Sequence, residues 1–174
     1  MTEQIRFDGF EAQIPQHPSE RNITCCFTGH RDINETPQLY AHVRTEIEAA
    51  YNNGYRIFRA GGALGFDTVA ALNTLALRES KYPDIRLELV LPYPDHHVRW
   101  NDHNKKLFTT TVEKANKIEY VSEHYTKWCM FARNRRLVEE SSLCICYMTD
   151  KKSGTGYTVD YAKKNGLKII NLAD

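Results

Sequence analysis

The chain has 174 residues, of which 41% are hydrophobic and 26% charged, and this indicates one globular domain with a core of its own. Its 23 lysines and arginines nearly balance its 22 aspartates and glutamates, so the basic excess of many nucleic-acid binders is missing. The first residues, MTEQIRFDGF, are polar and acidic, so we expect no secretory leader, and no apolar run approaches the roughly 18 residues of a membrane span. Together with five cysteines lacking a C-x-x-C pair, this predicts a cytoplasmic protein with free thiols that binds neither membranes nor nucleic acid.

Residues 1–20 show no clear period and are expected to form an N-terminal arm before a single domain at 21–174. Strand-like and helix-like segments alternate along that domain. The predicted strands are Ile23–Phe27, Tyr55–Ala60, Ile85–Tyr93, Lys117–Ser122, Leu143–Met148 and Leu167–Leu172. The predicted helices are Pro37–Asn53, one from about Phe66, His103–Asn116, Met130–Ser141 and Tyr157–Asn165. Alternation of this kind implies parallel strands with right-handed crossovers, so the predicted fold class is α/β, a Rossmann-like three-layer α/β/α arrangement with a mostly parallel sheet of about six strands.

Polar and glycine residues collect where the predicted strands end. The first strand ends in Gly29-His30-Arg31, and the second ends in Gly61-Gly62. The opposite ends carry plainer turns, such as Asn53-Gly54 and Asn165-Gly166. Ligands of open parallel sheets bind outside the carboxyl ends of the strands, so this asymmetry predicts the binding site there.

The glycine-rich turn Gly61-Gly62-Ala63-Leu64-Gly65 joins the second strand to a helix. Glycines let backbone N–H groups approach an anion closely, and the helix that follows adds unpaired N–H groups and a positive dipole end. The turn is therefore predicted to bind a phosphate, although a tight turn without a ligand has the same sequence. Asp67, in the first turn of that helix, is either a cap or a carboxylate that faces a ribose hydroxyl.

Two further segments are predicted to contribute to the site. Ser153-Gly154-Thr155-Gly156 forms a second strand-to-helix turn that can hold another part of the ligand. Arg133 and Arg136 lie three residues apart on one helix face, and their guanidinium groups suit phosphate or carboxylate. A solvated surface loop and a solvated basic face are the competing interpretations.

The polar segment after the third strand is predicted to contact the base or the ribose. It includes Pro92, Tyr93 and Asp95, and Trp100 is able to stack on a base. The segment contains metal-ligating residue types but lacks the histidine spacing of a helical zinc site, so we expect no metal.

Five motifs occur in a fixed order between Ile23 and Leu172: CCFTGHRDI, GGALGFDT, LPYPDHHVRW, MFARNR and SGTGYTVDYA. In this order they resemble the YpsA-like branch of the SMF/DprA-LOG (SLOG) superfamily. The resemblance implies a Rossmann-like fold that binds a small-molecule nucleotide or nucleotide derivative and requires no other cofactor. It also implies a homodimer, because related domains often dimerise.

The superfamily includes the LOG enzymes, which cleave the N-glycosidic bond of nucleoside monophosphates. Arg133 matches the arginine of their M-x-x-R-K motif, with Asn134 in place of the lysine, and Asp160 falls on the glutamate that closes P-G-G-x-G-T-x-x-E. The resemblance therefore implies that Arg133 holds the phosphate and that Asp160 stabilises positive charge on the ribose. A helix-dipole role is the competing interpretation of Asp160.

Three functions follow from these residues and from the resemblance. We predict a domain that binds or senses a nucleotide-type ligand. Hydrolysis of a nucleotide by Arg133 and Asp160 is the alternative. Binding of single-stranded nucleic acid, as in the DprA branch, is disfavoured by the near-zero net charge.

Overall fold

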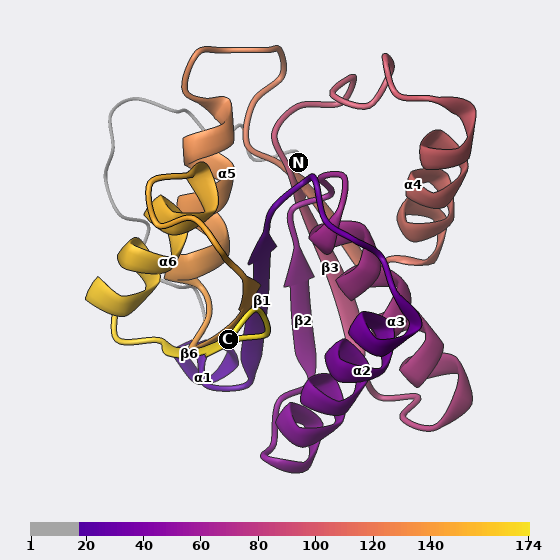
Figure 1. The fold of residues 1–174 in the computed structure, drawn as a ribbon, viewed down its shortest axis with the longest axis vertical. Coiled ribbons are helices and arrows are strands. Elements are labelled where there is room, and N and C mark those ends of the chain that lie inside the picture. The colour runs from indigo at the N-terminus through magenta and orange to yellow at the C-terminus, as the bar shows by residue number, and fades with distance from the viewer. Residues whose placement is uncertain (1–17) are drawn as a thin grey trace, which may run out of the picture.

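The computed structural model describes residues 18–174, in which strands and helices alternate along the chain (Figure 1). The strands are β1 (Thr24–Gly29), β2 (Ile57–Ala60), β3 (Arg86–Leu91), β4 (Lys117–Tyr120), β5 (Leu143–Tyr147) and β6 (Lys168–Asn171). The helices are α1 (Pro18–Arg21), α2 (Pro37–Asn52), α3 (Phe66–Ser80), α4 (Asp102–Lys114), α5 (Cys129–Glu139) and α6 (Gly154–Lys164). The predicted arm at 1–20 lies outside the described residues except where α1 begins. No helix within 18–174 has the length and apolar character needed to cross a membrane.

All six strands form one parallel sheet in the order β4-β3-β2-β1-β5-β6. This confirms the predicted Rossmann-like α/β class. The chain builds outward from β1 to β4 on one side and then returns to place β5 on the other side of β1. The connections that leave β1 and β5 therefore diverge, and a crevice opens between the carboxyl ends of these two strands.

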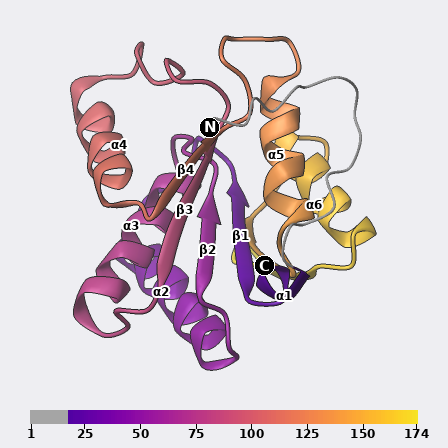
Figure 2. The same ribbon diagram turned by 180° about the vertical axis from the view of Figure 1, so that it is seen from behind.

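Helices cover both faces of the sheet, with α2, α3 and α4 on one side and α5 and α6 on the other (Figures 1 and 2). Alternate side chains of a strand point to opposite faces, so each strand contributes to two cores. On β1, Cys25 and Phe27 belong to the core under α2 and α3, whereas Cys26 belongs to the core under α5 and α6. The continuous apolar run of β1 reflects this burial on both faces.

Side-chain caps decide where two of the helices begin. Thr36 Oγ1 accepts a hydrogen bond from the Leu39 N–H at 3.1 Å, which starts α2 at Pro37 as predicted. Ser153 Oγ accepts from the Gly156 N–H at 3.0 Å and starts α6 at Gly154. The predicted start at Tyr157 was wrong by one turn, because weak helix propensity suggested a loop where the Ser153 cap fixes helical geometry.

A buried charge cluster ties β2 to its neighbours on the α5 side. Arg59 is 1% exposed, and its guanidinium pairs with Glu88 at 3.3 Å, Glu119 at 3.0 Å and Glu140 at 2.7 Å. These carboxylates come from β3, β4 and the residue that ends α5. A guanidinium with its five donors suits such a multiple contact, and the cluster fixes α5 against the sheet.

Candidate functional site

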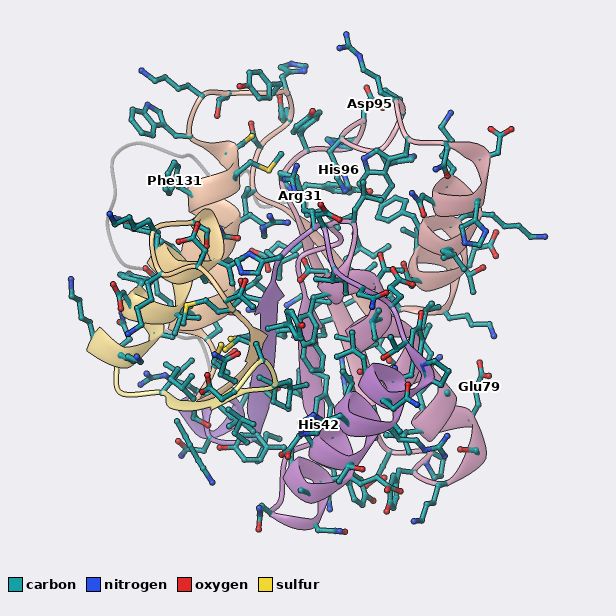
Figure 3. All side chains as sticks on the ribbon, in the orientation of Figure 1. Arg31, His42, Glu79, Asp95, His96 and Phe131 are labelled. Atoms are coloured by element: carbon teal, nitrogen blue, oxygen red, sulfur yellow. The ribbon has the colours of Figure 1, made fainter. Side chains whose placement is uncertain are left out.

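A cavity of about 330 Å³ opens at the crevice that the topology creates. Figure 3 shows Arg31 and Phe131 at this carboxyl edge of the sheet, well away from His42 and Glu79 on the α2 and α3 helices. The cavity is lined by four segments: the end of β1, the glycine turn with α3, one face of α5 and the start of α6. Its walls are formed by Phe27, Thr28, Gly29, His30, Arg31, Ala63, Asp67, Met130, Phe131, Arg133, Asn134, Leu137, Ser153, Gly154 and Thr155.

The exit from β1 supplies the cavity with an imidazole and a cation. His30 Nε2 accepts a hydrogen bond from the Thr149 N–H at 2.9 Å, so the donor of the neutral ring is Nδ1. The backbone carbonyl of His30 accepts a hydrogen bond from the Phe66 N–H at 3.1 Å, which joins the segment after β1 to the start of α3. Arg31 is exposed and lines the cavity, where its charge suits an anion.

Asp67 acts as an internal anion for the glycine turn. Its buried Oδ2 accepts from the Ala63 N–H at 3.3 Å and its carboxylate also accepts from the Gly61 N–H. Burial raises the pKa of Asp67, and the positive charge of Arg133 opposes that rise. The sequence allowed two interpretations of Asp67, a cap or a ribose contact. In the structure, its carboxylate accepts hydrogen bonds from the turn that precedes its own helix. The N–H groups it binds are those the turn would offer to a phosphate.

Packing accounts for the glycines of this turn. Gly65, the N-cap of α3, has a φ of 75°, and a Cβ there would overlap the backbone carbonyls of His30 and Arg31. Gly62 has a φ of 66°, and a Cβ there would overlap the Leu91 side chain. These two positions let the turn lie directly against the β1 exit and β3, which places Ala63 and Asp67 in the cavity wall.

Arg133 is the central side chain of the α5 wall. It is buried, donates to the Gly61 carbonyl, and donates from Nε to Asn134 Oδ1 at 2.8 Å. Burial lowers its pKa, and nearby Asp67 counteracts the effect. Arg136, which the sequence grouped with it, is outside the cavity wall. Its Nε pairs with Glu119 at 2.6 Å, so this arginine belongs to the Arg59 charge cluster.

The start of α6 faces the cavity on the opposite side from the glycine turn. Ser153, Gly154 and Thr155 line it, whereas Gly156 packs so closely on the Lys151 backbone that a Cβ would overlap it. The first N–H groups of a helix lack partners within the helix and carry its positive dipole end. Gly154 is exposed and lines the cavity, and a Cβ built on it meets no atom within 4 Å, so this position has room for a side chain.

Several predicted residues lie away from the cavity wall. Asp160 is exposed further along α6. Gly61, Gly62, Leu64 and Gly65 support the wall without being part of its surface. The predicted base contacts are also outside the wall: Pro92, Tyr93, Asp95 and Trp100.

The loop that holds these predicted base contacts is organised around a histidine. His96 Nε2 lies 3.0 Å from the Gly62 carbonyl and Nδ1 lies 3.1 Å from the Tyr93 carbonyl. Trp100 packs edge-on against His96 and Phe108, at 5.4 Å and 5.6 Å between ring centres. Burial lowers the pKa of His96. The loop therefore packs against the glycine turn through His96, and Trp100 lies in an aromatic cluster with His96 and with Phe108 of α4.

Three residues of the cavity wall on α5 were not singled out from the sequence. Met130, Phe131 and Asn134 line the cavity beside Arg133. All of them belong to the MFARNR motif, whose arginines alone were interpreted as functional. Spacing was the available signal, because residues three and four apart share a helix face and Met130, Arg133 and Asn134 have this spacing.

Comparison with known proteins identifies the family of this chain and agrees with its fold. The family model YpsA, described as the YspA SLOG family, matches residues 26–170. The chain belongs to this SLOG family. It is 25% identical over 138 residues to a UPF0398 protein of Halalkalibacterium halodurans, covering 78% of this chain and 71% of that protein. It is 28% identical over 127 residues to the uncharacterized SPbeta prophage-derived protein YoqJ of Bacillus subtilis, covering 66% of this chain and 73% of that protein.

The chain spans little more than half the length of some relatives. A UPF0398 protein of Bacillus pumilus is 26% identical to it over 105 residues, which cover 60% of this chain and 56% of that protein. Among solved structures, DNA processing protein A of Helicobacter pylori, described with its single-stranded DNA binding mode, shares the fold with a TM-score of 0.63 at 24% identity. That match covers 86% of this chain and 65% of the other. The Streptococcus pneumoniae protein gives a TM-score of 0.62 at 19% identity, over 86% and 50% of the two chains. These neighbours give no support to our expectation that nucleic acid is not a ligand.

Proposed function

We propose that this SLOG domain binds a nucleotide-type ligand, with a phosphate between the start of α6 and the β1 exit. The observation that carries the proposal is the cavity at the crevice between β1 and β5. There, Gly154 and Thr155, the first residues of α6, line the same space as His30 and Arg31, and the first N–H groups of a helix lack partners within the helix. The glycine turn supports this site, since its own N–H groups serve Asp67.

A ligand that binds only the folded state raises thermal stability by mass action. At 100 times its dissociation constant, the gain is about 2.7 kcal/mol, which is roughly 5–11 °C in Tm for a chain of this size. We expect at least one member of a panel of AMP, GMP, CMP, UMP and the corresponding di- and triphosphates to give such a shift. Mass spectrometry of material released from the purified protein by denaturation provides an independent identification.

Gly154 offers a substitution that affects the ligand and spares the fold. The Gly154→Asp variant adds a negative charge at a residue that lines the cavity, where a built Cβ meets no atom within 4 Å. At about 4 Å in an effective dielectric of 20, two unit charges interact by about 4 kcal/mol, so phosphate binding should fall by at least tenfold after screening. Gly154→Ala is the matched control and should retain the shift. Equal shifts in both variants would place the phosphate elsewhere, and no shift with any nucleotide would refute the proposal.

Hydrolysis of an N-glycosidic bond is the second candidate function. One observation favours Asp67, and not the LOG-like Asp160, as its carboxylate. Asp67 lines the cavity beside Arg133 and has a raised pKa, whereas Asp160 is exposed outside the wall. We expect any release of free base from a nucleotide to be lost in Asp67→Asn and retained in Asp160→Asn. The opposite pattern would favour the LOG-like assignment.

A further inference from the structure

A second hollow, of about 530 Å³, lies beside the cavity and is lined by Trp128, Phe131, Arg135 and Tyr157. Its three rings are unusually accessible for their type: Trp128 is 56% exposed, Phe131 41% and Tyr157 39%. Exposed apolar groups that gather around a hollow mark binding surfaces more often than scattered ones do. The rings come from α5, the residue before it, and α6.

The three rings stand at angles to one another. Phe131 meets Tyr157 edge-on at 5.3 Å between ring centres, and Trp128 is tilted by 52° from Phe131 at 6.1 Å. Because these rings are partly exposed, their faces offer surfaces on which a planar group can stack. Bases of nucleic acids and nucleotides stack on such aromatic faces, whatever their identity.

The hollow adjoins the proposed nucleotide site, and the two share one lining side chain. Phe131 lines both spaces, and Figure 3 shows it on α5 at the carboxyl edge of the sheet. On α6, Gly154 lines the cavity and Tyr157 lines the hollow one turn later. A ligand with its phosphate at Gly154 can therefore extend over Phe131 into the hollow.

The charges around the hollow favour an anion over a second copy of this chain. Lys127 Nζ lies 5.1 Å from the centre of the Trp128 ring, and Arg135 donates to the Tyr157 hydroxyl at 2.9 Å. Two copies meeting face to face would bring these cations together. A phosphate-linked ring would instead be attracted to them. The near-neutral net charge of +1 favours a small ligand over a long polyanion that needs an extended basic surface.

We propose that the ligand of this domain is of dinucleotide type, with two bases joined through phosphate, and that its second base stacks in the hollow of Trp128, Phe131 and Tyr157. This inference rests on the proposed function, because the first nucleotide occupies the neighbouring cavity. It assigns Trp128 a role in ligand selection. Trp128 lines the hollow and is not part of the cavity wall, so its contribution can be measured separately from that of the phosphate site.

Isothermal titration calorimetry tests the inference with each mononucleotide and its own dinucleotides: AMP with diadenosine diphosphate and pApA, and GMP with the guanosine equivalents. At least one dinucleotide should bind about 5- to 100-fold more tightly than its mononucleotide, the range expected for one stacked base. Trp128→Ala should abolish this gain and leave mononucleotide affinity unchanged, while Trp128→Phe retains most of it. Tyr120→Ala removes another exposed ring, on β4, and serves as the matched control.

The contrary outcomes separate the two proposals. If a mononucleotide binds but no dinucleotide binds more tightly, or if Trp128→Ala weakens both equally, the dinucleotide inference fails and the nucleotide site stands. If the gain through Trp128 appears only with a dT10 oligonucleotide, the hollow serves single-stranded nucleic acid and the inference also fails. A wild-type dimer in size-exclusion chromatography that Trp128→Ala converts to a monomer would identify the hollow as a self-interface. Absence of binding by every nucleotide would refute both proposals.

Discussion

Replacement of Gly62 by alanine should destabilise the protein strongly, although Gly62 is not part of the cavity surface. Its φ of 66° is unfavourable for an alanine by about 1–2 kcal/mol. The new Cβ would overlap Leu91 Cδ2, and Leu91 is fully buried, so relief of the overlap requires overpacking of the core at about 1–3 kcal/mol. Together, these effects predict a loss of about 2–5 kcal/mol, or roughly 4–20 °C in Tm for 174 residues.

Thermal and urea denaturation of the ligand-free protein measure this effect, with Gly154→Ala as the comparison. Gly154 has no positive φ and no atom near a built Cβ, so alanine there should be neutral or should stabilise α6 by up to about 1 kcal/mol. If Gly62→Ala is as stable as the wild type, the conclusion that packing requires this glycine is wrong.

Two further predictions concern charged groups away from the cavity. Burial lowers the pKa of His96 below the unfolded value of about 6.5, so stability should be fully present above that pH and fall as the pH drops toward the folded pKa, by up to about 1.4 kcal/mol per pH unit. His96→Gln should have a shallower pH dependence of the free energy of unfolding between pH 7 and 5, and identical slopes would contradict this. Arg59→Met leaves Glu88, Glu119 and Glu140 without their shared cation and should cost about 3–5 kcal/mol in urea denaturation. A loss below about 1 kcal/mol would show that these carboxylates reach solvent or protonate easily.

The sequence predicted the framework of this domain from local signals. Apolar runs at β1 and β5, helical spacing between them, and the Thr36-Pro37 start of α2 all depend on residues close together in the chain. Alternation then implies a parallel sheet, and a parallel sheet places its ligands at the carboxyl ends of the strands. Nine predicted site residues line the cavity as a result: Gly29, His30, Arg31, Ala63, Asp67, Arg133, Ser153, Gly154 and Thr155.

Only the tertiary structure decided which side chains within each segment face the cavity. Arg133 and Arg136 are equivalent in sequence, but the cavity is lined by the face of α5 that carries Arg133 and Leu137, four residues apart, whereas Arg136 lies off that face and reaches Glu119 instead. Asp160 is seven residues beyond the Ser153 cap, or about 10 Å along α6, and it is exposed. Phe131 lines both the cavity and the hollow because α5 packs beside α6. Depth along a helix and rotation about its axis depend on contacts between distant segments, and local sequence patterns do not contain them.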